Sequence, residues 1–136
     1  MKRIYSLLAA AIMLIMLSSC GAETTAPHTI RIGVALYQQE DTFISTVAKE
    51  LQRAAQEAEQ DGDVKINLYF ADGKGSQTVQ NEQIDRFLDR EYDVICINIV
   101  DRTAAAVIID KAQAADIPVI FFNRQPVEED LRRWEH

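Results

Sequence analysis

The fold is decided by residues 93–100, which read Asp93-Val94-Ile95-Cys96-Ile97-Asn98-Ile99-Val100. This stretch is apolar nearly throughout, which is the pattern of a β-strand covered on both faces. Strands of that kind occur in parallel sheets that lie between layers of helices. The stretch therefore predicts the α/β class, with a parallel sheet as the middle layer.

On both sides of this stretch the sequence alternates between strand and helix periodicity. Strand patterns occur at residues 30–37, 64–70 and 117–122, and helical patterns at 42–60, 79–88 and 103–115, with a further helix possible at 127–134. This alternation, joined by right-handed crossovers, predicts a Rossmann-like three-layer α/β/α lobe with a parallel sheet. The expected strand order is 2-1-3-4.

Ligands of open α/β sheets bind outside the carboxyl ends of the strands, beside the point where the strand order reverses. The residues that follow the strands there are aromatic, acidic or amidic: Tyr37, Asp41, Phe43, Asn98 and Asn123. Carboxylates and amides match the hydroxyls of a sugar, and aromatic faces match its C–H patches. These residues therefore form a candidate sugar-binding edge.

The same residues also have plainer interpretations. Phe43 lies on the apolar face expected for the helix at 42–60, so the pattern alone places it in the core. Asp41 suits the N-cap of that helix. Asn98 and Asn123 suit turns at strand ends, and Arg124 suits a solvated surface. The residues by themselves leave both interpretations open.

The first residues are typical of an export signal. Lys2 and Arg3 precede an apolar run of about 14 residues, which is short for a bilayer span of roughly 20 but suits a signal peptide. The run ends in Leu17-Ser18-Ser19-Cys20, which resembles the lipobox of bacterial lipoproteins. That resemblance implies a lipoprotein signal peptide at 1–19, a lipidated Cys20 and flexible tether at 20–29, and the folded lobe at 30–136. The chain would then be exported and lipid-anchored at the outer surface of the cell membrane or in the periplasm.

Composition excludes several classes of function. The 136 residues suit one domain, and the net charge of −7 argues against nucleic acid as a partner. Only two histidines are present, and motifs for a nucleophile elbow, a phosphate loop or a zinc helix are missing, so we expect no enzyme. Cys96 is expected to be a small apolar residue of its strand, without a role in a disulfide or metal site.

Four segments together resemble one family. They are residues 32–43, 80–85, 97–101 and 119–126, which contain IGVALY followed by DTF, QNEQID, INIVD and VIFFNRQP. In this order and spacing they resemble the type I periplasmic sugar-binding proteins of ABC transporters, and most of all the galactose/glucose-binding branch. The resemblance covers residues 30–126 and corresponds to the amino-terminal lobe of that family.

The resemblance implies a role for each candidate residue. Asp41 would accept hydrogen bonds from sugar hydroxyls, Phe43 would stack on a sugar face, and Asn98 would bond a ring hydroxyl. Tyr37 would line the cleft, and Asn123 would lie near the cleft and hinge. The implied ligand is a hexose such as galactose or glucose, and the implied partner is an ABC permease or a chemoreceptor.

The family has two lobes that close on the sugar, and this chain matches only one. The resemblance therefore implies a truncated form that binds weakly or not at all alone. It also implies no cofactor or metal here, because the calcium site of the galactose/glucose branch would lie in the second lobe. The alternative function is a sugar-sensing lipoprotein that presents its ligand to a chemoreceptor or histidine kinase.

Overall fold

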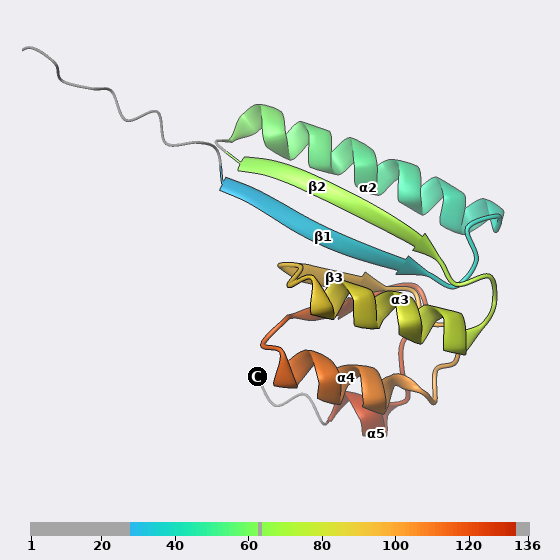
Figure 1. Ribbon diagram of the computed structural model, residues 1–136. Coiled ribbons are helices and arrows are strands. Elements are labelled where there is room, and N and C mark those ends of the chain that lie inside the picture. The colour runs from blue at the N-terminus through green and yellow to red at the C-terminus, as the bar shows by residue number, and fades with distance from the viewer. Residues whose placement is uncertain (1–27, 63, 133–136) are drawn as a thin grey trace, which may run out of the picture.

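The computed structural model describes residues 28–62 and 64–132 (Figure 1). Its elements in chain order are β1 (His28–Leu36), α2 (Thr42–Asp61), β2 (Val64–Asp72), α3 (Gln77–Asp89), β3 (Val94–Ile97), α4 (Ala105–Ala114), β4 (Val119–Phe121) and α5 (Glu128–Leu131). The predicted signal peptide and Cys20 lie outside the described residues. None of the helices in the described part of the chain is long and apolar enough to cross a membrane.

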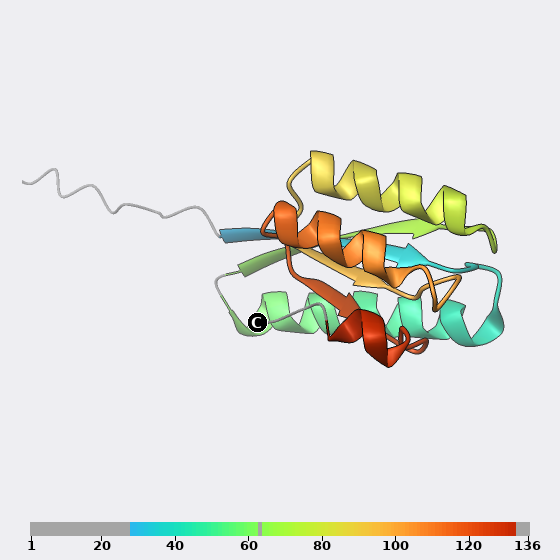
Figure 2. The same cartoon turned by 90° about the horizontal axis from the view of Figure 1, so that it is seen from below.

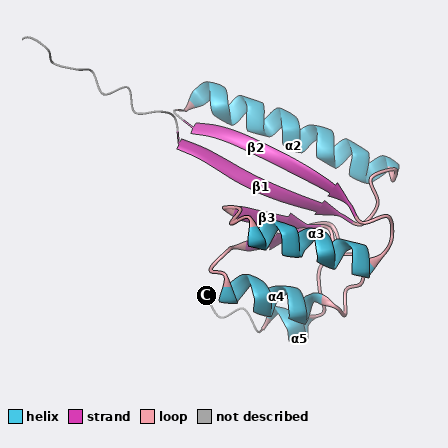
Figure 3. Cartoon of the chain, in the orientation of Figure 1, coloured by secondary structure: helices cyan, strands magenta, loops and turns pink. Residues whose placement is uncertain are grey.

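The four strands form one parallel sheet in the order β2-β1-β3-β4, as predicted. Figure 3 shows β2, β1 and β3 in this order. β1 lies in the middle, where Ala35 pairs with Ala71 of β2 and with Ile97 of β3. β2 lies on one side of β1, and β3 and β4 lie on the other. Right-handed crossovers therefore place α2 on one face of the sheet and α3 and α4 on the opposite face (Figure 2).

Each face of the sheet has its own apolar core, because neighbouring residues of a strand point to opposite faces. Val34 and Leu36 pack with Ile44 on the α2 side, while Ala35 packs on the side of α3 and α4. The second cluster is larger and includes Ile84, Phe87, Ile95, Ile97, Ile99, Ile108 and Ile109. The nearly continuous apolar pattern of residues 93–100 reflects this cover on both faces.

The predicted tether reaches two residues too far. We expected residues 20–29 to be flexible, but β1 begins at His28, where His28 pairs with Val64 and Thr29 with Lys65. Both side chains are exposed, so the hydrophobic pattern carries no signal for this part of the strand. The backbone pairing with β2 extends the strand without help from apolar side chains.

β3 is shorter than the apolar run that predicts it. The strand ends at Ile97, although Ile99 is fully buried. Beyond that point the N–H of Val100 donates to the side chain of Gln80, at 2.9 Å, instead of joining a strand ladder. The run of apolar residues reports burial here, and burial continues past the end of the pairing.

The start of α2 differs from the pattern in one important residue. Ile44 is fully buried and leads the apolar stripe that Ala48 and Leu51 continue, whereas Phe43 is 59% exposed. Successive helical residues point about 100° apart, so the helix cannot bury both side chains against the sheet. The core interpretation of Phe43 is therefore wrong, and the N-cap interpretation of Asp41 is confirmed, since its Oδ1 accepts a hydrogen bond from the N–H of Ile44 at 3.0 Å.

We predict that Gly33→Ala destabilises the lobe. A methyl group at Gly33 would lie 2.6 Å from Cδ2 and 2.7 Å from Cγ of Phe87, whose ring is buried between α3 and the sheet. Overpacking of this kind costs about 1–3 kcal/mol, measurable as a lower midpoint of urea unfolding. Gly62→Ala is the matched control, because its nearest neighbour would be 3.5 Å away and the backbone there is extended. Equal midpoints for the two variants would contradict the tight contact.

Candidate functional site

The carboxyl ends of the four parallel strands lie at one edge of the lobe (Figure 2). The loops after β1, β3 and β4 all begin there, and α2 starts beside them. These loops and the first turn of α2 carry the predicted site residues: Tyr37, Asp41, Phe43, Asn98 and Asn123. The topology therefore brings together residues that are far apart in the sequence.

Tyr37 and Asp41 form a direct pair. The phenol of Tyr37 donates a hydrogen bond to Oδ2 of Asp41, while Oδ1 accepts from the N–H of Ile44. The phenol and then this N–H are the main causes that hold the pKa of Asp41 below its ordinary value. The same pairing raises the pKa of Tyr37. At neutral pH the pair is thus an ionised acceptor beside a protonated phenol.

Arg124 completes this cluster from the loop after β4. Its guanidinium carbon lies 4.0 Å from the centre of the Tyr37 ring, within the range of a cation–π contact. Nη1 donates to the carbonyl of Val100 at 3.0 Å. Arg124 was expected to be a solvated surface residue, and its side chain is only half-exposed because it contacts the Tyr37 ring and the carbonyl of Val100. The sequence signals for this residue were its position directly after Asn123 at a strand end and its place in the segment 119–126.

Asn98 lies beneath the edge and is fully buried. Its Nδ2 donates to the carbonyl of Phe122 at 3.3 Å, and the N–H of Tyr37 lies 3.5 Å from its Oδ1. The backbone N–H of Asn98 donates to Ala35 at 2.9 Å. One amide therefore links the ends of β1, β3 and β4. The predicted contact of Asn98 with a sugar stays a prediction, and the structure adds a second role inside the protein.

Phe43 and Asn123 occupy exposed positions on the same edge. The ring of Phe43 leaves the first turn of α2 with most of its surface accessible. Asn123 has a φ of 59°, a left-handed conformation that asparagine tolerates better than most residues. A hydrogen bond from the N–H of Arg124 to the carbonyl of Phe122 closes this turn at 2.6 Å. Both side chains are available to a ligand that approaches the edge.

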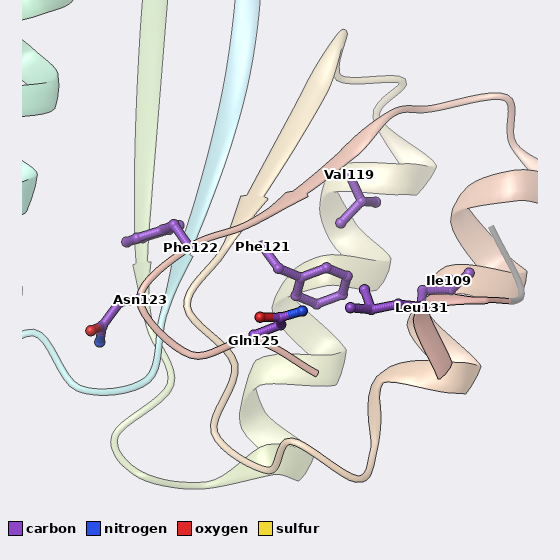
Figure 4. A pocket seen from close by; sticks show the side chains of 7 residues that line it. All are labelled: Ile109, Val119, Phe121, Phe122, Asn123, Gln125 and Leu131. Carbon is purple, nitrogen blue, oxygen red and sulfur yellow. The ribbon is translucent and has the colours of Figure 1, made fainter. Parts of the chain in front are cut away.

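A pocket of about 540 Å³ lies beside β4 (Figure 4). It is lined by Ile109, Val119, Phe121, Phe122, Asn123, Gln125 and Leu131. Figure 4 shows Phe122 and Asn123 pointing away from the side on which Val119, Phe121 and Leu131 gather. Asn123 is the one predicted site residue in its lining, so the pocket is separate from the Tyr37–Asp41 pair.

The described residues offer no obvious metal centre. Within residues 28–62 and 64–132, no group of three or more His, Cys, Asp or Glu side chains is arranged to hold an ion. Cys96 is half-buried, and burial raises the pKa of its thiol. Both features fit the prediction that Cys96 packs as a small apolar residue.

Comparison with known proteins identifies relatives of this fold. The family described as periplasmic binding protein domain matches residues 32–134. The D-galactose/methyl-galactoside binding periplasmic protein MglB of Haemophilus influenzae is 37% identical over 121 residues, which are 89% of this chain and 34% of that protein. These are binding proteins and not enzymes, in agreement with the expectation from the sequence.

Solved structures give the same result. A protein from Mycobacterium smegmatis in complex with β-D-fucofuranose is 30% identical, with a TM-score of 0.59 over 68% of this chain and 28% of that one. An ABC transporter solute binding protein from the same organism, with bound glycerol, is 27% identical, with a TM-score of 0.61 over 74% of this chain and 33% of the other. The chain spans about a third of the length of these relatives.

We predict that Tyr37→Phe raises the pKa of Asp41 toward its ordinary value of 3.8, because the phenol is the largest cause of its lowering. The lowered pKa of Asp41 stabilises the fold above pH 3.8, and this contribution is lost as the pH falls through the lowered value. The stability difference between the wild type and Tyr37→Phe should therefore shrink in acid.

The measurement is a carbon-detected NMR titration of the Asp41 carboxyl, together with urea unfolding at several pH values. Tyr69→Phe is the matched control, since Tyr69 is an exposed tyrosine of β2 away from the strand ends. An unchanged Asp41 titration in Tyr37→Phe would mean that the hydrogen bond does not hold in solution.

Proposed function

The chain belongs to the periplasmic binding protein family, and on this premise we propose that its edge binds a hexose such as galactose or glucose for an ABC importer. The name of the Haemophilus relative refers to galactose, and one structural relative holds a furanose sugar. These ligands belong to proteins of which this chain matches about a third, so for this chain they support the class of ligand and not its identity.

The observation that carries the proposal is the arrangement of Asp41 between Tyr37 and Phe43. A carboxylate kept ionised accepts strong hydrogen bonds from hydroxyl groups. Two positions along the chain, Phe43 exposes an aromatic ring in the first turn of the same helix. A pyranose needs both features at once, because its ring carries hydroxyls around the rim and C–H groups on its faces.

The edge contacts a ligand from one side. Ligand sites usually bury most of the surface of a small molecule, and a single open edge covers far less of it. We therefore expect weak hexose binding by this chain alone, with a Kd on the order of 1 mM or weaker. Tight binding needs a second surface that closes over the sugar, as in the two-lobed members of the family.

Export and a lipid anchor complete the proposal. The family is named for its periplasmic location, and the segment ending in Cys20 supplies the predicted signal. Acyl chains on Cys20 would hold the lobe at a membrane surface, because each buried methylene contributes about 0.8 kcal/mol. The ABC permease would then receive sugar from an anchored binding protein.

We predict that Phe43→Ala abolishes hexose binding without loss of stability, since the exposed ring contributes little to the core. Phe43→Tyr keeps an aromatic face and should bind like the wild type. NMR titration with D-galactose and D-glucose, followed at the amides of Tyr37, Asp41 and Asn98, measures the affinity. Sub-micromolar binding would contradict the one-sided site, and a wild type that does not respond to either sugar would contradict the proposed ligand class.

We predict that Cys20→Ala moves the chain from the membrane fraction to the soluble fraction of cells that express it. The thiol of Cys20 is the predicted site of acylation, and incorporation of labelled fatty acid should be lost with it. Cys96→Ala is the matched control, because Cys96 is the second of the two cysteines and lies in β3. Label in Cys20→Ala, or its loss in Cys96→Ala, would disprove the assignment.

A further inference from the structure

The segment QNEQID at residues 80–85 belongs to α3 and contributes no side chain to the proposed sugar contacts. Gln77, Gln80 and Gln83 nevertheless follow one another at intervals of three residues, and each bonds the backbone near a strand end. Oε1 of Gln77 accepts from the N–H of Asp101 at 2.7 Å. Nε2 of Gln83 donates to the carbonyl of Asp72, the last residue of β2, at 2.7 Å.

Gln80 is the central member and is fully buried. Its Oε1 accepts from the N–H of Val100 at 2.9 Å, and its Nε2 donates to the carbonyl of Asn98 at 2.9 Å. The same Nε2 lies 3.4 Å from the carbonyl of Ala35 in β1. A single amide thus joins the end of β1 to the segment that follows β3.

This amide takes the place of a strand ladder. β3 ends at Ile97, so the carbonyl of Asn98 and the N–H of Val100 are bonded by Gln80 instead of by a neighbouring strand. Gln80 shares a face of α3 with Ile84 and Phe87, where an apolar side chain would pack as well. A buried amide is favourable at such a place only while its hydrogen bonds are made.

Two routes lead from Gln80 to Tyr37. The first passes through Asn98, whose side chain lies under the N–H of Tyr37. The second passes through Val100, whose carbonyl accepts a hydrogen bond from Arg124. The guanidinium of Arg124 in turn lies over the Tyr37 ring. Tyr37 in turn bonds Asp41. Gln80 is therefore connected, through Asn98 and through Val100 and Arg124, to Tyr37 and from there to Asp41.

We propose that Gln80 is a positioning residue, which holds the segment after β3 against β1 and thereby sets the orientation of Tyr37 and Asp41 for the sugar. This inference rests on the proposed function for its effect on affinity. Its effect on the edge itself is independent of any ligand, so the two can fail separately.

The main test is Gln80→Met, which keeps a side chain of similar length and removes the amide. Ile108→Val is a control that loses core packing in α4 without touching the edge. Gln56→Met is a control at an exposed position of α2. In all forms we would measure thermal stability, the hydrogen exchange of the Val100 amide, the pKa of Asp41 and the affinity for D-galactose.

In Gln80→Met the amide hydrogen of Val100 should exchange with solvent about tenfold faster relative to the amides of β1, because the side-chain oxygen that accepts its hydrogen bond is gone. The pKa of Asp41 should rise toward its ordinary value, and the affinity for galactose should fall about tenfold. Both controls should keep the wild-type exchange, pKa and affinity. If Gln80→Met loses thermal stability but keeps the Asp41 pKa and the affinity, Gln80 is merely structural and the inference is overturned.

Gln80→Glu is the second test, to be used if Gln80→Met does not fold. A protonated carboxyl offers one donor and one acceptor, like the amide, and burial raises the pKa of such a group. We expect Gln80→Glu to resemble the wild type in mild acid, where its buried carboxyl is protonated. As this carboxyl ionises, the hydrogen bonds to Asn98 and Val100 should be disturbed, and the NMR signal of the Asp41 carboxyl should change. If the NMR signal of the Asp41 carboxyl does not change when the Glu introduced at position 80 ionises, the inference is overturned. Galactose binding absent from every form, the wild type included, would overturn the proposed function, while the Asp41 pKa still decides the role of Gln80.

Discussion

The pairing of β1 with β3 is the contact on which the rest of the lobe depends. These strands are separated in sequence by α2, β2 and α3, yet Ala35 and Ile97 are direct neighbours in the sheet. Because the two strands are parallel, their carboxyl ends lie at the same edge of the sheet, where Tyr37 contacts Asn98 and Arg124. The reversal of strand order beside β1 also places α2 on its own face, with its first turn at that edge.

Asp41 shows how the fold and the proposed site share one side chain. As an N-cap it satisfies an N–H that the first turn of α2 leaves without a helical partner. The same carboxylate accepts from Tyr37, so its orientation is fixed before any ligand arrives. A ligand that bonds Asp41 does not need to order it, which lowers the entropic cost of binding. The structural role of Asp41 therefore supports its proposed role as an acceptor.

Several features of the lobe could be predicted from periodicity. The alternation of strands and helices and the order of the sheet follow from local patterns and from the handedness of crossovers, and both are confirmed. The predicted strand boundaries are wrong at residues where strand pairing and side-chain burial do not coincide. His28 and Thr29 pair as a strand while exposed, and Ile99 is buried after its strand has ended. Hydrophobic patterns report burial alone, so they misplace such boundaries.

Residue types and their order along the chain are enough to predict the fold class, the family and the set of residues at the strand ends. Which of those residues contact one another depends on how the strands and helices pack. Phe43 and Ile44 are adjacent apolar residues, and only the docking of α2 on the sheet showed that Ile44 enters the core. Arg124 and Gln80 are ordinary polar residues in the sequence, and they acquire partners only when distant strand ends converge. Their contacts depend on distances across the sheet, which no local pattern contains.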